Sequence, residues 1–468
     1  MNDSISRRNF LKLAGMVGVG FAGLQIVGCR MEGGVSRVRS HKWKKYGVLI
    51  PDPMGFLDLP RGFSYQIISS QGNTMSDGFL VPGKPDGMAT FEGGGGKTIL
   101  IRNHELSSEM RELGPFGPDL KLLKKLEKEK IYDYGQGELP GLGGTTTIVY
   151  DTRAQKVELE YLSLAGTFRN CAGGPTPWNT WLSCEETVVK AGYRLEKDHG
   201  YVFEVPASIS QQLAMPVPIK AMGRFQHEAV GIDPQTSIVY QTEDRLDGLI
   251  YRYIPNVPEK LHAGGKLQAL VIKDEPGRDT RNWKEIPGRK FPRNTPLPVE
   301  WVDLDNIDAP EDDLRIRGYT KGAAIFGRGE GMWFGVEECY FACTFGGENR
   351  QGQIFRYRPG QYEGTERESE SPGTLELFSE PDNSMLMQNC DNLTVAPWGD
   401  LIVCEDTLEA RVMGITPDGG YYPLASNARK NSEFAGVTFS PDGTTLFVNI
   451  QHEGLTFAIT GPWDRGKV

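Results

Sequence analysis

The chain lacks several patterns that would identify a function at once. None of its seven cysteines has the Cys-x-x-Cys spacing of a zinc site, and the Gly-x-Ser-x-Gly pattern of a serine hydrolase is absent. No basic run is interleaved with aromatic residues, and the formal net charge is −10 with a pI near 5.4. We therefore expect no nucleic-acid binding. An acidic surface suits cations instead.

The amino terminus predicts export. Ser6-Arg7-Arg8-Asn9-Phe10-Leu11-Lys12 precedes an apolar, glycine-rich stretch, and twin arginines in this place are typical of a Tat signal. A Sec signal or a short membrane anchor is the alternative, although the stretch is short for a membrane span. Ile26-Val27-Gly28-Cys29 resembles a lipoprotein box, with Cys29 lipidated or the chain cleaved nearby. We expect residues 1–29 to be a signal, and the protein to be periplasmic, anchored to the outer membrane or secreted.

A strand–turn–strand unit recurs along the chain. Its copies end in acidic or amide side chains, and they span residues 174–186, 228–244, 391–406 and 434–449. Further strand-like runs follow in residues 200–205 and 248–253, and another spans 353–357. Alternating apolar runs around tight turns predict hairpins, and their repetition predicts an all-β fold, a β-propeller with six blades. We expect one domain over residues 30–468.

Two long segments interrupt the repeats. Residues 105–140 contain the clearest helical pattern, near Leu120 to Lys130, and we interpret them as an inserted cap. Residues 255–320 are rich in proline, aspartate and arginine and predict a long excursion over one face. A closed propeller has few exposed strand edges, so we expect a monomer.

Three acidic pairs occupy the same position in the repeats: Glu185-Glu186, Glu243-Asp244 and Glu405-Asp406. Equivalent strand ends lie on one side of a propeller, so these pairs are expected to converge. Clustered carboxylates raise one another's pKa unless cations are present, and calcium accepts six to eight oxygen ligands. The alternative is that the pairs are solvated strand ends without a function.

Cys171 stands apart from the other cysteines. It follows Asn170 and precedes the glycine pair Gly173-Gly174, as a loop ligand would, whereas Cys184, Cys343 and Cys404 lie in alternating apolar runs and predict buried thiols. An even number of cysteines in an exported chain also permits disulfides. A thiolate close to carboxylates has the composition of a metal site.

With these residues in place, the chain resembles the PhoX alkaline phosphatases, a bacterial family exported by Tat. Glu453 departs from the family, which commonly has proline there. The resemblance covers nearly all of the mature chain and depends on Arg102–Glu105, Asn170–Glu186, His227–Val230, Arg328–Gly331, Asp391–Asp406, Phe447–His452 and Gly461–Trp463.

The resemblance implies a central cluster of ferric iron and calcium ions. Cys171 would be the thiolate ligand of iron, Glu228 and Glu330 would bind iron, and Glu186 would bind calcium. Glu228 would also bridge to calcium, and Arg328 would contact the substrate phosphate, so that Arg328, Glu330 and Glu228 carry the reaction. Further calcium ligands would be Glu185, Glu243, Asp244, Asp391, Glu405 and Asp406.

The resulting expectation is an exported, metal-dependent phosphatase that hydrolyses phosphate monoesters for phosphate scavenging. Clustered metal ions neutralise the phosphate and activate water, so that no serine nucleophile is required. One alternative is a calcium-dependent propeller that hydrolyses lactones or other esters, which needs no thiolate. Another is a non-catalytic propeller stabilised by calcium that binds a partner.

Overall fold

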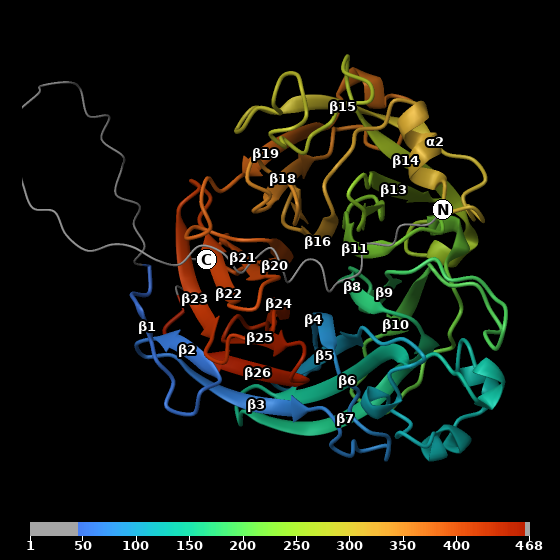
Figure 1. The fold of residues 1–468 in the computed structure, drawn as a ribbon, viewed down its shortest axis with the longest axis vertical. Helices are drawn as coiled ribbons and strands as arrows, with labels where there is room; N and C mark the ends of the chain where they lie inside the picture. The colour runs from blue at the N-terminus through green and yellow to red at the C-terminus, as the bar shows by residue number, and fades with distance from the viewer. Residues whose placement is uncertain (1–44, 464–468) are drawn as a thin grey trace, which may run out of the picture. The chain divides into compact units, whose positions relative to one another are not determined.

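The computed structural model describes residues 45–463, which form strands joined by turns and short helices. These residues belong to one compact unit, and their strands radiate from a common centre (Figure 1). The predicted all-β propeller is confirmed. The predicted signal, with Arg7, Arg8 and Cys29, lies outside the described residues. Within residues 45–463, no helix has the length and apolar character needed to cross a membrane.

The strands of the described residues pair into five sheets. The first contains β4 (Pro85–Glu92), β5 (Lys97–His104), β6 (Gly143–Asp151) and β7 (Lys156–Thr167). The second contains β8 (Asn170–Pro175), β9 (Thr180–Glu185) and β10 (Val202–Pro206). The third contains β11 (His227–Ile232), β12 (Val239–Glu243), β13 (Ile250–Pro255), β14 (Gly265–Ile272), β15 (Leu297–Asp303), β16 (Gly329–Phe334), β17 (Cys339–Cys343), β18 (Gln353–Arg358) and β19 (Thr374–Ser379).

The other two sheets contain both ends of the described chain. One consists of β1 (Leu49–Ile50), β2 (Leu57–Pro60), β20 (Cys390–Val395), β21 (Leu401–Glu405), β22 (Arg411–Ile415) and β23 (Tyr421–Asn427). The other consists of β3 (Ser64–Ser70), β24 (Phe434–Phe439), β25 (Thr445–Ile450) and β26 (Leu455–Thr460). Because β3 pairs with β26, an early strand completes the last sheet and ties the two ends of the fold together.

Six innermost strands form a closed ring at the centre. β4 packs against β8, β8 against β11, β11 against β16, β16 against β20, β20 against β24, and β24 against β4. We call each innermost strand, together with the strands that follow it in the same sheet, a blade. The nine-stranded sheet contains two blades, β11–β14 and β16–β19, because β15 pairs with both β14 and β19 and bridges their outer edges. Equivalent residues of successive blades therefore face one another around the ring.

The segment between β5 and β6 differs from the expectation of a helix near Leu120 to Lys130. It forms four 3₁₀ helices instead: η1 (Arg111–Leu113), η2 (Lys121–Lys125), η3 (Lys128–Lys130) and η4 (Gly135–Gly137). Leu120 has a left-handed φ of 57° and Leu126 is extended, which limits η2 to five residues. The apolar side chains of Leu120, Leu123 and Leu126 recur every three residues and pack into one cluster, which is the period of a 3₁₀ helix.

Residues 255–320 are more regular than expected. They contain η6 (Leu261–Ala263), the paired strands β14 and β15, and the helix α2 (Leu314–Thr320). Two further 3₁₀ helices elsewhere are η5 (Lys220–Met222) and η7 (Glu368–Glu370). The cysteines of the described residues are all free and buried, as predicted for Cys184, Cys343 and Cys404.

Candidate metal centre

Each innermost strand is interrupted by a β-bulge near its beginning. The pairing register shifts after Pro85, Asn170, His227, Gly329, Cys390 and Ala435. A bulge redirects the side chain at the extra residue. In the first five strands the residue directly after this position is called a ring residue, and these are Asp86, Cys171, Glu228, Glu330 and Asp391. In β24 the shift comes one residue later, and Ala435 is the equivalent ring residue, because Gly436 packs against the carbonyl of Asp86 as Gly331 packs against that of Asp391.

Small residues let the ring close tightly behind these side chains. A Cβ added to Gly87 would lie 2.6 Å from the Cα of Ala172, and one added to Gly331 would lie 2.6 Å from the Cα of Asn392. Glycine is required at both positions because neighbouring backbones approach so closely. The close approach brings five potential ligands from five blades to one end of the ring.

Two groups of side chains are arranged as ligand sets. The first ligand group is Cys171, Glu186 and Glu228, and the second is Glu228, Glu330 and Asp391. Within each group one ligand atom per residue lies within 4.8 Å of the others. Glu228 belongs to both groups, so the two sets are adjacent and share one carboxylate.

The electrostatics of this cluster are unfavourable for the isolated chain. Burial raises the pKa of Glu228 well above its usual value, and the neighbouring Glu186 and Asp391 raise it further. Burial likewise raises the pKa of Glu186 to about 7 and that of Asp391 to about 8. Burial raises the pKa of the Cys171 thiol well above its usual value, and the neighbouring Glu228 and Glu186 raise it further. Bound cations would remove the mutual repulsion and favour the ionised forms.

The three acidic pairs do not converge as units. Successive side chains of a strand point to opposite sides, and the second members, Glu186, Asp244 and Asp406, point to the ring residues. Glu186 belongs to the first ligand group. Asp244 and Asp406 interact with Glu330 and Asp391, respectively. Glu105 occupies the same position in the β4 blade. Its amide donates to the Lys84 carbonyl, just as the amide of Glu186 donates to the Arg169 carbonyl.

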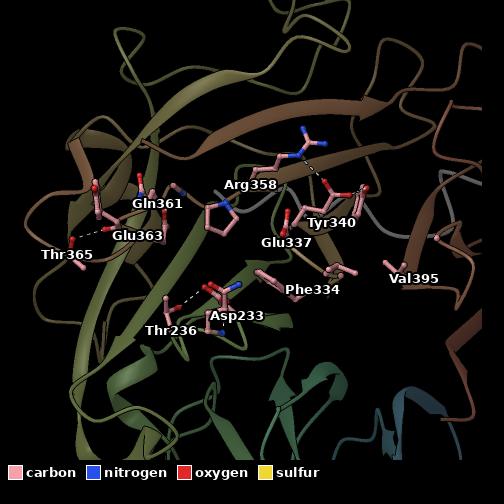
Figure 2. Close-up of a pocket in the computed structure, with 18 residues that line it drawn as sticks. Asp233, Thr236, Phe334, Glu337, Tyr340, Arg358, Gln361, Glu363, Thr365 and Val395 are labelled. Atoms are coloured by element: carbon pink, nitrogen blue, oxygen red, sulfur yellow. Dashed lines mark hydrogen bonds and ion pairs between the residues drawn. The ribbon is translucent and has the colours of Figure 1, made fainter. Parts of the chain in front are cut away.

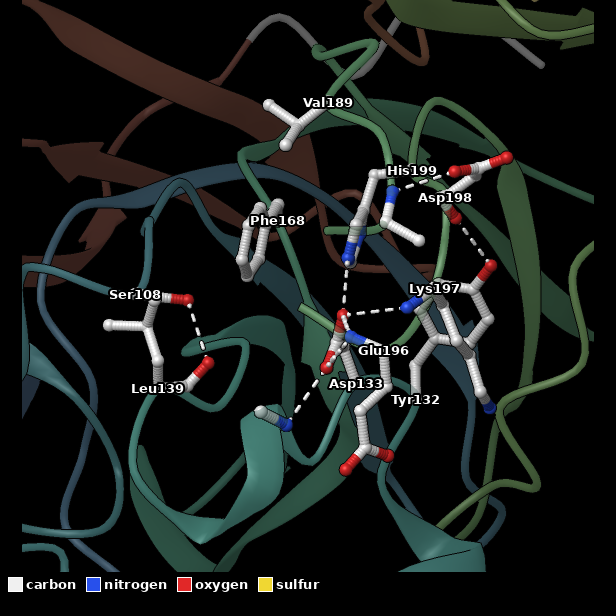
Figure 3. Close-up of polar contacts among 12 residues, drawn as sticks. Ser108, Tyr132, Asp133, Leu139, Phe168, Val189, Glu196, Lys197, Asp198 and His199 are labelled. Atoms are coloured by element: carbon white, nitrogen blue, oxygen red, sulfur yellow. Dashed lines mark hydrogen bonds and ion pairs between the residues drawn. The ribbon is translucent and has the colours of Figure 1, made fainter. Parts of the chain in front are cut away.

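The first members of the pairs bind within their own blades. Glu185 accepts hydrogen bonds from the amides of Phe168 and Gly200 at 2.9 and 2.8 Å and from His199 at 2.6 Å. His199 also contacts Asp133 at 3.3 Å, from the segment between β5 and β6 (Figure 3).

Glu243 and Glu405 are held in the same manner. Glu243 accepts hydrogen bonds from the Tyr251 hydroxyl at 2.7 Å and from the Leu249 amide at 3.2 Å. Glu405 accepts from the Gln388 amide at 2.7 Å and from Nε of Arg411 at 2.8 Å. None of Glu185, Glu243 and Glu405 is in either ligand group of the described residues.

Arg328 lies beside the second ligand group. Its Nε and Nη2 donate to the two oxygens of Asp244 at 2.8 and 2.9 Å, and Nη2 also donates to Glu330 at 2.6 Å. Its Nη1 lies 3.7 Å from Asp406. Glu330, burial and Asp244 act together on this guanidinium, and the net effect raises its pKa. The charge of Arg328 is therefore permanent, and its side chain remains 29% exposed.

Sequence analysis missed several charged residues of the centre. Asp86 accepts a hydrogen bond from Gln451 at 2.8 Å, and burial, Asp391 and Glu105 raise its pKa well above the usual value. Burial and Asp406 likewise raise the pKa of Glu433. One signal could have revealed Asp86: the dipeptide Asp86-Gly87 matches Glu330-Gly331 at the start of another strand.

A separate cavity lies at the opposite ends of the same strands (Figure 2). Its volume is about 810 Å³, and it is lined by Phe334 and Val395, which end β16 and β20. Glu330 and Asp391 lie near the beginnings of those strands. The cavity is therefore distinct from the metal centre.

The chain is similar to known proteins in sequence and in fold. A family model described as alkaline phosphatase PhoX matches residues 44–158 and 136–454. Among solved structures, PhoX of Pseudomonas fluorescens in complex with vanadate, a transition state analogue, has a TM-score of 0.63 at 18% identity, covering 88% of this chain and 97% of that chain. A search of curated proteins found no match.

A second solved structure is more distant. A gluconolactonase of Xanthomonas campestris has a TM-score of 0.39 at 12% identity, covering 91% of this chain and 99% of that chain. This similarity is too low to bear on function. The family model, in contrast, spans most of the sequence. The chain belongs to the PhoX alkaline phosphatase family.

Proposed function

We propose that this protein is an exported, metal-dependent phosphatase that hydrolyses phosphate monoesters and supplies phosphate to the cell. Membership of the PhoX family gives the reaction class. The observation that carries the proposal is the pair of ligand groups that share Glu228, with Arg328 beside one of them. Two adjacent cations and an arginine suit the displacement of a phosphoryl group. Export is inferred from the twin arginines and Cys29 in the sequence.

The excess of negative charge supports a site for several cations. Three cationic side chains lie among the acidic groups: Lys84, Arg169 and Arg328. The interacting carboxyl groups are Asp86, Glu105, Glu186, Glu228, Asp244, Glu330, Asp391, Asp406 and Glu433. With nine carboxyl groups against three cations, divalent or trivalent ions are the natural counter-charge.

The donor types favour iron at Cys171, Glu228 and Glu330 and calcium at the other carboxylates of the two ligand groups. Cys171 offers a thiolate, which is a good ligand for ferric iron and a poor one for calcium. Glu228 and Glu330 would complete the iron sites, and Glu186, Asp391 and Asp406 offer oxygens suited to calcium. Glu185, Glu243 and Glu405 are left out of this ligand set, because donors of their own blades occupy them.

The chain's own residues then bind and orient the substrate. When bound, the cations neutralise the charge of the phosphoryl group and polarise its oxygens. Arg328 donates to phosphoryl oxygens through Nη1, because the fork of Nε and Nη2 is engaged by Asp244 and Glu330. Asp244 orients that fork by holding two of its donors. We assign Asp244 this positioning role in place of calcium binding.

The proposal is tested by assaying the metal-loaded protein on aryl phosphate monoesters, phosphodiesters and lactones. We expect turnover of the monoesters and its loss after treatment with a chelator. Readdition of iron and calcium should restore activity, whereas magnesium alone should not. Metal-loaded protein that hydrolyses lactones but no phosphate ester would replace the proposal with the lactonase alternative.

A further inference from the structure

The internal repeat places Arg169 and Arg328 in equivalent positions. Each lies two residues before a ring residue and has a left-handed backbone, with φ of 47° and 55°. Each backbone carbonyl also accepts a 2.9 Å hydrogen bond from the residue directly after the second strand of its blade, Glu186 for Arg169 and Thr344 for Arg328. The left-handed conformation is unfavourable for these residue types. Lys84 and Asn389, at the same position of two other blades, are also left-handed, so this conformation belongs to the repeat. It gives the two arginine side chains the same starting direction from the backbone.

The two arginines also make parallel contacts. Nη2 of Arg328 donates to Glu330 of the second ligand group. Nη2 of Arg169 donates to Glu186 of the first ligand group, and it lies 2.9 Å from Glu105. Each ligand group therefore has its own arginine. Because the groups share Glu228, the two guanidinium groups flank a single centre.

Arg169 retains capacity to bind an anion. Its Nε donates to the carbonyl of Glu186 at 3.2 Å and its Nη2 to the carboxylates. Within residues 45–463 its Nη1 makes no hydrogen bond, and the side chain is 37% exposed. Neutralisation of Glu105 does not depend on Arg169 alone, since Lys84 also bonds to that carboxylate at 3.1 Å. A role beyond charge balance is therefore open to Arg169.

We propose that Arg169 is a second arginine that contacts the phosphoryl group, in addition to Arg328. This inference rests on the proposed function. A tetrahedral phosphoryl group presents several oxygens, so two guanidinium groups on different sides can each donate to it. Glu105 and Glu186 act as positioning residues that hold Arg169 in place.

The test measures the binding of inorganic phosphate to the metal-loaded protein by calorimetry. R169Q is expected to weaken phosphate binding about 10- to 100-fold, as loss of a hydrogen bond to a charged group does. R328Q should have a similar effect, and R169K should restore part of the affinity. The control R429Q removes an arginine of comparable exposure that pairs with Glu453 at 2.8 Å, and it should bind phosphate like the wild type.

Metal content is measured on every variant. Removal of the positive guanidinium beside Glu186 should not weaken the binding of metal ions, so R169Q is expected to keep its iron and calcium. Wild-type affinity in R169Q, or affinity that added metal restores, would overturn the role of Arg169 alone. Absence of phosphate binding and of phosphatase activity in the wild type would overturn the proposed function as well.

Discussion

Arg328 and Asp244 are joined by two parallel hydrogen bonds, 2.8 Å from Nε to one carboxylate oxygen and 2.9 Å from Nη2 to the other. They come from different blades, since Asp244 follows β12 and Arg328 directly precedes β16. The pairing fixes the plane of the guanidinium while Nη2 also meets Glu330 at 2.6 Å. The arginine that we propose as a substrate contact is thus oriented by one blade and supplied by another.

Loss of this orientation should reduce turnover more than metal binding. We expect D244A to lower kcat/KM for an aryl phosphate about 10- to 100-fold, because charged hydrogen bonds of this kind contribute about 1.5–3 kcal/mol. R328K should lower it comparably, since lysine cannot make the two-pronged contact. Steady-state kinetics with metal analysis checks both. If D244A lost calcium with no direct effect on catalysis at saturating calcium, Asp244 would be a ligand.

The members of an acidic pair should respond differently to substitution. E405Q removes the charge that Arg411 and the Gln388 amide bind inside the blade, and should lower the free energy of unfolding by about 2 kcal/mol. D406N alters a half-exposed group beside Arg328 and should leave unfolding nearly unchanged while reducing bound calcium. Urea unfolding and elemental analysis of the two variants separate these effects. Loss of calcium in E405Q together with loss of stability in D406N would contradict the different roles that we assign to the two members of the pair.

Stability should depend on pH through His199. Burial lowers its pKa, but Glu185 and Asp133 outweigh this effect and raise the pKa to about 9 from its usual 6.5. The folded state therefore binds the proton more tightly than the unfolded state. The resulting stabilisation, on the order of 3 kcal/mol, is fully present below about pH 6.5 and is lost as the pH rises through 9.

Unfolding measured between pH 6 and 10 checks this prediction. The wild type should lose stability across that range, and H199Q should be less stable at pH 6 with a weaker dependence on pH. An equal slope in both proteins would mean that the ion pairs of His199 with Asp133 (Figure 3) and with Glu185 do not carry the effect.

The close packing of the innermost strands can be tested at Gly331. In G331A the new Cβ would lie 2.6 Å from the carbonyl oxygen of Asp391, so we expect a loss of about 1–3 kcal/mol in unfolding free energy. G335A, in the same blade, meets nothing closer than 3.4 Å and is the matched control. Equal stability of the two variants would show that the ring tolerates wider spacing.

Sequence patterns predicted the hairpins and the position of their acidic ends, because alternation and turn residues are local signals. They did not predict that the side chains of Glu185 and Glu186 point in different directions, since this depends on which side of β9 faces the ring. Asp86 was missed because its hairpin turns at four glycines, Gly93–Gly96, rather than at a proline. The side-chain contacts of Arg169 depend on Glu105, which comes from another blade.

The segment at Leu120 shows the opposite case. Its charges and leucines suit a helix, but tertiary packing of Leu123 with Phe116 selects short 3₁₀ turns. Local propensity is a weak guide where a segment is held by the surface on which it packs.

We propose above that Cys171 is an iron ligand of a thiolate–carboxylate centre, and its removal tests this most directly. Iron and calcium per chain should be measured in the natively produced wild type, in C171A and in the control C184A, which removes an equally buried thiol that lies outside both ligand groups. We predict iron in the wild type and in C184A, and loss of both iron and phosphatase activity in C171A. Full iron content and activity in C171A would contradict the account.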